Sequence, residues 1–189
     1  MSNVWLNQTH HRTLRAVMDR LIPGDEWGPG AGEAGAADYV DLLLGAFGFD
    51  PPHIWAGGPF SGRHGGDAGF GRWLELGPVE ELAWRIRIEG TKDDPERMFN
   101  GPVTGWQDRY RATLSALGDD FADQSTQEQD RRLEALAEED RTMLYTHACE
   151  AHYGDPVYGG NVDGAGWRAI AFDGDVLPRG WTDAEVSEP

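Results

Sequence analysis

Apolar side chains recur every three to four residues along most of this chain, which is the spacing of one face of an α-helix. The residues that mark these faces are Leu14, Val17, Met18 and Leu21; Ala36, Tyr39, Val40, Leu43 and Phe47; Val79, Leu82, Ala83 and Ile86; Trp106, Tyr110, Leu114 and Leu117; Leu133 and Leu136; and Leu144, His147, Ala148 and Ala151. The pattern predicts an all-α protein, an irregular bundle of about six helices.

Proline, glycine and short polar residues mark where these helices begin and end. The first helix is expected to stop before Pro23 and the second at Gly48. Ser125, with Glu128 three residues later, has the pattern of a capping box that begins a helix. The acidic residues 138–140 suit the start of the last long helix, because the first turn of a helix favours negative charge.

Glycine and proline are dense in residues 48–77, yet the aromatic residues Trp55, Phe60, Phe70 and Trp73 persist there. A disordered linker would not retain so many aromatic side chains. We therefore expect a long, ordered aromatic loop in this part of the chain.

The glycine-rich end of the chain, residues 153–189, contains Trp167 and Trp181 and one short strand-like run, residues 167–172. A chain of 189 residues with 39% hydrophobic content can bury one core. We therefore predict a single domain over residues 1–189, with a core at residues 6–174 and a C-terminal tail at residues 175–189.

The chain carries 16 basic and 33 acidic residues, which gives a net charge of −17. Such a surface repels phosphate backbones and anionic lipid headgroups, so we expect neither nucleic acid nor a membrane surface as a partner. No stretch approaches the apolar length of a membrane-spanning helix, and we predict no insertion into a membrane.

Cys149 is the single cysteine. A single cysteine excludes an internal disulfide and a cysteine-rich zinc site, and it is consistent with a reducing compartment. The first residues show neither the basic region nor the apolar run of an export leader. We expect a cytoplasmic protein; export together with a partner that carries the signal is the alternative.

Gly30, Gly32 and Gly35 have the spacing of a dinucleotide-binding fingerprint. That fingerprint follows a buried strand within a βαβ unit, whereas a segment rich in proline and glycine precedes it here. We interpret these glycines as part of a loop that enters the second helix.

His147 and Glu150 share one face of a predicted helix, and with His152 they could bind a divalent metal. An independent metal-dependent enzyme is therefore one alternative function. A di-iron bundle site would need Glu-x-x-His pairs, which this sequence lacks. We favour a hydrogen-bonded core histidine at His147 and predict neither a metal site nor catalytic residues.

Residues 153–161, Tyr-Gly-Asp-Pro-Val-Tyr-Gly-Gly-Asn, combine a turn-forming Asp-Pro pair with two adjacent glycines. Tyr158, Asn161 and the nearby Trp167 add aromatic area and hydrogen-bonding groups. This segment either wraps its own bundle or contacts a partner, and both can hold at once.

Between about Leu6 and Gly174 the chain resembles the gluconate 2-dehydrogenase subunit 3 family. The elements that carry the resemblance are Leu21-Ile22-Pro23, residues 29–35, Phe99-Asn-Gly-Pro102 with Gly105-Trp106-Gln107, and Gly154-Asp-Pro-Val-Tyr-Gly-Gly-Asn161 with Gly166-Trp167. The last element is the specific one. Two features differ from the family pattern: the chain shows no twin-arginine leader, and Asp173-Gly174 replaces a common proline-glycine pair.

Small subunits of that family associate with a large FAD-dependent oxidoreductase of the glucose-methanol-choline class, which oxidises sugars or polyols. The resemblance implies a non-catalytic small subunit that supports the folding, flavin loading or stability of this partner. FAD is then expected in the partner, and no cofactor in this chain. A transient chaperone that releases the flavoprotein after loading is a second alternative.

The chain contains eight tryptophans, more than a bundle core of this size would need. Several fall in predicted loops, and tryptophan is enriched where protein partners bury each other's surface. Packing beneath the long loop is the alternative explanation. The residues that we predict to bind the partner are Tyr158, Gly159, Gly160, Asn161 and Trp167, with Trp27 and Trp55 as secondary candidates.

Overall fold

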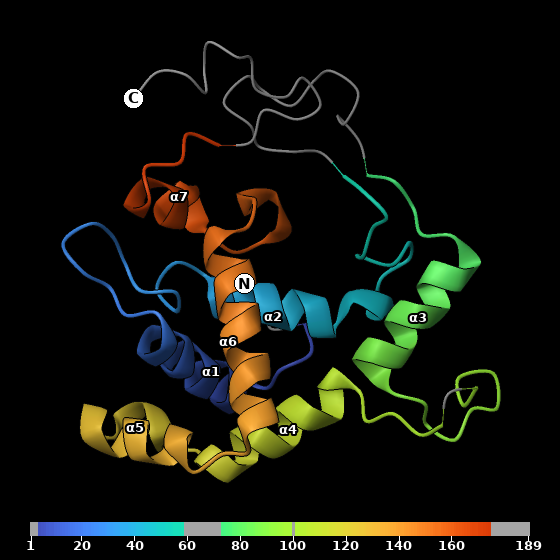
Figure 1. Cartoon of the computed structure of the whole chain (residues 1–189), viewed down its shortest axis with the longest axis horizontal. Helices are drawn as coiled ribbons and strands as arrows, with labels where there is room; N and C mark the ends of the chain where they lie inside the picture. The colour runs from blue at the N-terminus through green and yellow to red at the C-terminus, as the bar shows by residue number, and fades with distance from the viewer. Residues whose placement is uncertain (1–3, 59–72, 100, 175–189) are drawn as a thin grey trace.

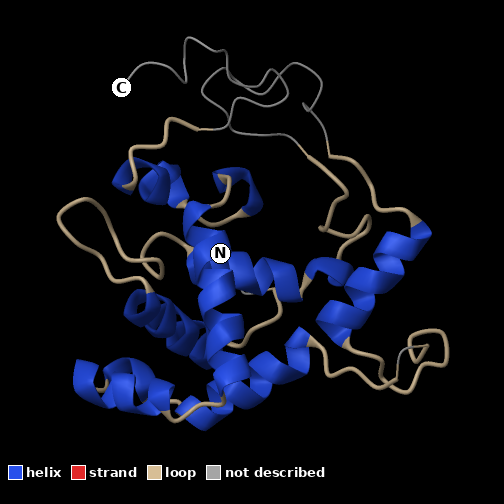
Figure 2. Ribbon diagram, in the orientation of Figure 1, coloured by secondary structure: helices blue, strands red, loops and turns tan. Residues whose placement is uncertain are grey.

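The computed structural model describes residues 4–58, 73–99 and 101–174 (Figure 1). Its α-helices are α1 (Gln8–Leu21), α2 (Ala36–Leu44), α3 (Pro78–Glu89), α4 (Trp106–Leu117), α5 (Thr126–Glu134), α6 (Glu138–Tyr153) and α7 (Ala165–Ala169). Short 3-10 helices are η1 (Ala46–Gly48), η2 (Phe121–Asp123), η3 (Pro156–Tyr158) and η4 (Val162–Gly164). Across the described ranges the elements are helices and loops, with one isolated antiparallel bridge between Gly57 and Leu74 (Figure 2). The predicted all-α, irregular bundle is confirmed.

Helix α6 runs through the middle of the molecule and packs against α1, α2 and α7 (Figure 1). Helix α1 in turn contacts α2, α4 and α5. The side chains buried between them include Leu14, Val17, Met18, Val40, Leu44, Tyr110, Leu114, Leu117, Leu144, Ala148 and Ala151. Full burial of one leucine or valine side chain stabilises a fold by about 1.5–3 kcal/mol, so apolar contact holds this bundle together.

Helix α3 lies to one side of the bundle and contacts α2 and α4 (Figure 1). A second, smaller apolar cluster joins it to the rest of the protein. The members of this cluster are Ala46, Ile54 and Ile88, with Leu43, Phe47, Leu76, Trp84 and Trp106 packed against them. Helix α3 and the loop after η1 therefore form a separate wall beside α2.

The buried carboxylate of Asp41 ties the start of the chain to α2. Its two oxygens accept backbone hydrogen bonds from Val4 at 2.6 Å, Trp5 at 2.9 Å and Leu6 at 2.6 Å. Asp41 is 4% exposed, and three donors offset the cost of burying its charge. The segment before α1 is thereby fixed against the bundle.

The glycines of the loop before α2 are needed for close packing against α1. A Cβ at Gly32 would clash with the Arg15 carbonyl oxygen, and one at Gly30 would lie 2.5 Å from the Asp19 carboxylate. Gly35 precedes α2 with φ of +92°, a conformation that favours glycine. The prediction that these glycines form a loop entering the second helix is confirmed.

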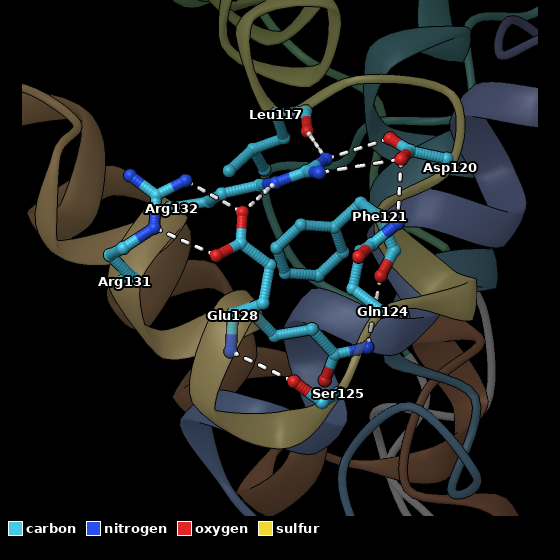
Figure 3. Close-up of polar contacts among 9 residues, drawn as sticks. Leu117, Asp120, Phe121, Gln124, Ser125, Glu128, Arg131 and Arg132 are labelled. Carbon is cyan, nitrogen blue, oxygen red and sulfur yellow. Dashed lines mark hydrogen bonds and ion pairs between the residues drawn. The ribbon is translucent and has the colours of Figure 1, made fainter.

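Helix α5 begins at the predicted cap, but only half of the capping box forms. The Ser125 hydroxyl accepts from the backbone N–H of Glu128 at 3.3 Å. The Glu128 carboxylate instead binds Arg131 and Arg132, at 2.6–2.9 Å (Figure 3). Hydrogen bonds from these two arginines lower the pKa of Glu128 to about 2. The arginines outcompete the Ser125 N–H because they bring two full charges.

The strand predicted at residues 167–172 is wrong, because Trp167 lies within α7. Asn161 contacts the first turn of this helix: its Oδ1 accepts from the Gly166 N–H at 2.8 Å. A single strand also needs a neighbouring strand to pair with, and the described residues provide none here. The predicted tail at residues 175–189, with Trp181, lies outside the described residues, as do Phe60 and Phe70.

Within residues 4–58, 73–99 and 101–174, no helix is both long enough and apolar enough to span a bilayer.

Candidate functional site

A pocket of about 620 Å³ opens where α2, α3, α6 and the loop after η1 meet. Its lining residues come from parts of the chain that are far apart in sequence. They are Tyr39, Leu42, Leu43, His53, Ile54, Trp55, Trp84, Cys149, Glu150, Ala151, Tyr153, Gly154, Asp155, Tyr158 and Gly160. Pockets of 300–1,000 Å³ lined by apolar and aromatic groups are typical of binding sites.

A continuous series of aromatic contacts connects the loop after η1 to η3 on one side of this pocket. Phe49 stacks on His53 at 3.8 Å between ring centroids, and His53 lies 6.0 Å from Trp55. Trp55 stacks on Trp73 at 4.9 Å, and Trp73 meets the edge of Tyr158 at 5.4 Å. Each such pair contributes about 0.5–1.5 kcal/mol beyond the area that it buries. The aromatic loop is thus ordered by ring contacts in its described part.

The other wall of the pocket is the second apolar face of α2. Ala36, Ala37, Val40 and Leu44 are buried in the core. Tyr39, Leu42 and Leu43 are half-buried and line the pocket. Helix α2 is therefore apolar on two faces, and the core covers only one of them.

Glu150 places a carboxylate in these mostly apolar surroundings. The Tyr39 hydroxyl donates a hydrogen bond to its Oε2 at 3.3 Å. Desolvation by the pocket walls raises the pKa of Glu150, while this hydrogen bond and the charge of Arg87 oppose that rise. Burial and then the charge of Glu150 raise the pKa of Tyr39. The tyrosine therefore stays neutral and acts as a hydrogen-bond donor.

The segment after α6 is held in shape by its own side chains and by two glycines. The Asp155 carboxylate accepts from the Val157 N–H at 2.9 Å and starts η3. Gly159 has φ of +103°, and a Cβ on it would lie 2.7 Å from Leu42. A Cβ on Gly160 would clash with the Ala151 carbonyl oxygen. These glycines let η3 lie against α2 and α6, which brings Tyr158 into the pocket.

Asn161 and Trp167 face inward. Asn161 is 0% exposed, and its amide donates to the Gly154 carbonyl at 2.8 Å while its oxygen binds Gly166. Trp167 is 8% exposed and donates from Nε1 to the Tyr153 carbonyl at 2.8 Å. These two predicted docking residues brace the segment from within, as the interpretation of a wrapping segment expects.

The predicted docking residues therefore separate into groups. Tyr158, Gly160 and Trp55 line the pocket, and Gly159 supports it. Trp27 lies outside the pocket, in the loop before α2, and is 70% exposed.

The residues of the metal hypothesis do not form a metal site. His147 is 2% exposed, and its Nδ1 lies 2.8 Å from the Tyr110 hydroxyl. Burial lowers the pKa of His147 to about 4. Across the part of the chain that the structure describes, no three His, Cys, Asp or Glu side chains are grouped so that they could hold a metal ion. His147 is the hydrogen-bonded core histidine that the sequence favours.

The contributions of Tyr39, Leu42 and Trp84 to the pocket were not predicted from the sequence. A signal was present in α2, whose sequence Ala-Ala-Asp-Tyr-Val-Asp-Leu-Leu-Leu is apolar around more of its circumference than one buried face requires. Trp84 carried no comparable signal, because its helix α3 has a single expected apolar face.

Comparison with known proteins gives one positive finding. The family model described as gluconate 2-dehydrogenase subunit 3 matches residues 8–174, a range that runs from the first residue of α1 past the end of α7. Searches among curated proteins and among solved structures return no match.

Proposed function

Because the chain belongs to the gluconate 2-dehydrogenase subunit 3 family, we propose that it is a non-catalytic small subunit of a large FAD-dependent oxidoreductase. In this proposal the large subunit binds FAD and oxidises a sugar or polyol. The small subunit binds it, assists its folding and flavin loading, and stabilises it. The observation that carries the proposal is the aromatic pocket, since its wall includes Gly154, Asp155, Tyr158 and Gly160, which belong to the segment on which the family resemblance rests.

The chemistry of the pocket supports a role in binding. Tyrosine and tryptophan are enriched at the energetic centres of protein interfaces, and Trp55, Trp84 and Tyr158 all line this pocket. Trp27, with 70% of its surface exposed outside the pocket, adds a second aromatic contact point. A stable interface buries about 1,200–2,000 Å² in total. Residues from several helices and loops must contribute to an area of this size.

The direct test is co-expression of this chain with a glucose-methanol-choline type flavoprotein from the same genome. Size-exclusion chromatography should show both chains in one peak at fixed stoichiometry, with flavin absorbance near about 450 nm. The large subunit expressed alone should contain less flavin and unfold at a lower temperature. Two separate peaks and a fully flavin-loaded large subunit would contradict the proposal.

The same experiment separates a permanent subunit from a transient chaperone. A chaperone would raise the flavin content of the large subunit and then elute apart from it. Cell fractionation of the complex tests the associated proposal of a cytoplasmic location, which suits the single cysteine, Cys149.

A matched pair of variants tests whether the pocket contributes to binding. Tyr158→Ala removes a ring that lines the pocket, whereas Tyr145→Ala removes an exposed ring of α6 that does not line it. We expect the first to weaken association by about tenfold or more and the second to change it little. Equal effects of the two variants would remove the pocket from the proposed interface.

A further inference from the structure

The pocket is aromatic and acidic at once. The lining residues that the structure describes include two carboxylates, Glu150 and Asp155, but no lysine or arginine. Asp155 uses its carboxylate to hold η3, whereas Glu150 has one side-chain donor among the described residues, the Tyr39 hydroxyl. Glu150 is thus the carboxylate that can take a further hydrogen-bond donor.

Among the described residues, the cation whose charge acts on Glu150 is Arg87, and its guanidinium contacts aromatic rings. The positive charge of Arg87 lowers the pKa of Glu150, but desolvation raises it by more. The Arg87 guanidinium lies over the rings of Trp84, at 4.9 Å, and Trp106, at 5.6 Å. No ion pair joins it to Glu150 among the residues that the structure describes. Within the described ranges, Glu150 therefore has no ion-pair partner of the kind that a carboxylate in apolar surroundings favours.

The rings of the pocket suit a planar cation. A guanidinium group stacks on aromatic faces and forms two parallel hydrogen bonds to a carboxylate, which an ammonium group cannot do. This protein uses the same contact within its own fold: Arg85 lies 4.1 Å from the Phe47 ring centroid, and Arg111 lies 5.2 Å from that of Trp5.

On this basis we propose that the pocket receives an arginine side chain of the large subunit, which stacks on the pocket's rings and pairs with Glu150. The inference rests on the proposed function and names the chemistry of the contact. Charge complementarity supports a protein partner with a basic side chain, since this chain carries a net charge of −17. The pocket volume of about 620 Å³ is larger than the volume of one side chain. In the proposal, apolar residues next to the arginine therefore also enter the pocket and contact Leu42 and Ile54.

The test measures the dissociation constant of the purified complex for three forms of the small subunit. Glu150→Gln keeps the shape of the side chain and removes its charge, and it should weaken binding by about tenfold or more. Glu134→Gln, on α5 away from the pocket, removes the same charge and should change binding less than about twofold. The binding of wild type should also depend more steeply on salt than that of Glu150→Gln.

A second variant tests the aromatic part of the contact. Tyr153→Leu keeps an apolar side chain at the pocket but removes a ring, and it should weaken binding by about threefold to tenfold. Helical circular dichroism equal to that of wild type would confirm that each variant is folded.

Chemical labelling then identifies the partner's cation. Phenylglyoxal modifies accessible arginines, so mass spectrometry of the labelled wild-type complex should show one protected arginine of the large subunit. The same arginine should be labelled in the Glu150→Gln complex. If the complex forms but Glu150→Gln binds as tightly as Glu134→Gln, the arginine inference is wrong and the proposed function stands. If no complex forms with wild type, the proposed function itself is wrong.

Discussion

Two tyrosines from different helices each meet a titratable group on α6, and the two pairs have opposite surroundings. Tyr110 of α4 lies 2.8 Å from His147 in the core, where the two residues are 0% and 2% exposed. Tyr39 of α2 donates to Glu150 at 3.3 Å in the pocket, where the tyrosine is half-buried and the glutamate is exposed.

The difference shows why similar residue types have different roles on one helix. In the core, the Tyr110 hydroxyl and Nδ1 of His147 are hydrogen-bonded to each other, so the pair adds stability. In the pocket, one donor leaves the carboxylate able to accept further hydrogen bonds. We therefore expect changes in the first pair to affect folding, and changes in the second to affect binding.

Removal of the core imidazole should have the largest effect. His147→Ala leaves a cavity and a buried Tyr110 hydroxyl without its partner, so we expect the free energy of unfolding to fall by about 4 kcal/mol. Glu150→Ala should change it by less than about 0.5 kcal/mol. Urea unfolding measures both, and equal losses would show that the two pairs do not differ.

Acid should have the next largest effect on stability and should distinguish the two pairs, because the pKa of His147 is lowered and the pKa of Glu150 is raised. His147 has a pKa of about 4 in the folded chain against 6.5 as its ordinary value. The unfolded chain therefore binds this proton first, and stability is lost as pH falls from 6.5 to 4. The loss attributable to His147 should approach about 3 kcal/mol.

His147→Gln provides the control for this dependence. The difference in unfolding free energy between wild type and His147→Gln should shrink or reverse between pH 6.5 and 4, although the lowered pKa of His152 contributes a loss to both. Glu150 acts in the other sense: its pKa is raised, so the folded chain holds that proton more tightly and stability falls as pH rises. A pH-independent difference would contradict a neutral, buried His147.

The wall segment of the pocket provides a test of intermediate size. Asn161→Ala removes two buried hydrogen bonds, to Gly154 and Gly166, and should cost about 2 kcal/mol of stability as well as weaken partner binding. Tyr158→Leu should weaken binding with a smaller change in stability. Chemical unfolding measures the change in stability, and a binding assay measures the change in affinity. An Asn161→Ala variant as stable as wild type would mean that this residue does not brace the pocket.

The smallest expected effects come from the two hydroxyls. Tyr110→Phe leaves Nδ1 of His147 without its partner in the core and should cost about 1 kcal/mol. Tyr39→Phe removes a hydrogen bond that water can replace, so its cost should be below about 0.5 kcal/mol. Thermal unfolding of both variants compares these two stability costs. A larger loss of stability for Tyr39→Phe than for Tyr110→Phe would contradict the expected difference between core and pocket.

Local spacing predicted the helices, and it predicted His147 as a core residue because Leu144, Ala148 and Ala151 share its face. It also singled out Tyr158, Gly160 and Trp55, which do line the pocket. In each case the information lay within a few residues of the sequence.

The pocket itself could not be predicted in this way, since it depends on residues as distant as Tyr39 and Tyr158 meeting in space. Periodicity shows that a helix face is apolar but not whether another helix covers it. The same limit applies to Trp167, where a short apolar run has a strand-like pattern although the described residues provide no partner strand.

The carboxylate of Asp41 connects the segment before α1 mechanically to α2. Its bonds to the backbone N–H groups of Val4, Trp5 and Leu6 fasten the segment before α1 to α2, so a pull on this segment would reach α2 through Asp41. Tension applied there, by a translocating machine or by a tethered fusion, would pass into α2, whose other apolar face forms the pocket. Helix α2 thus both anchors the segment before α1 and forms a wall of the pocket.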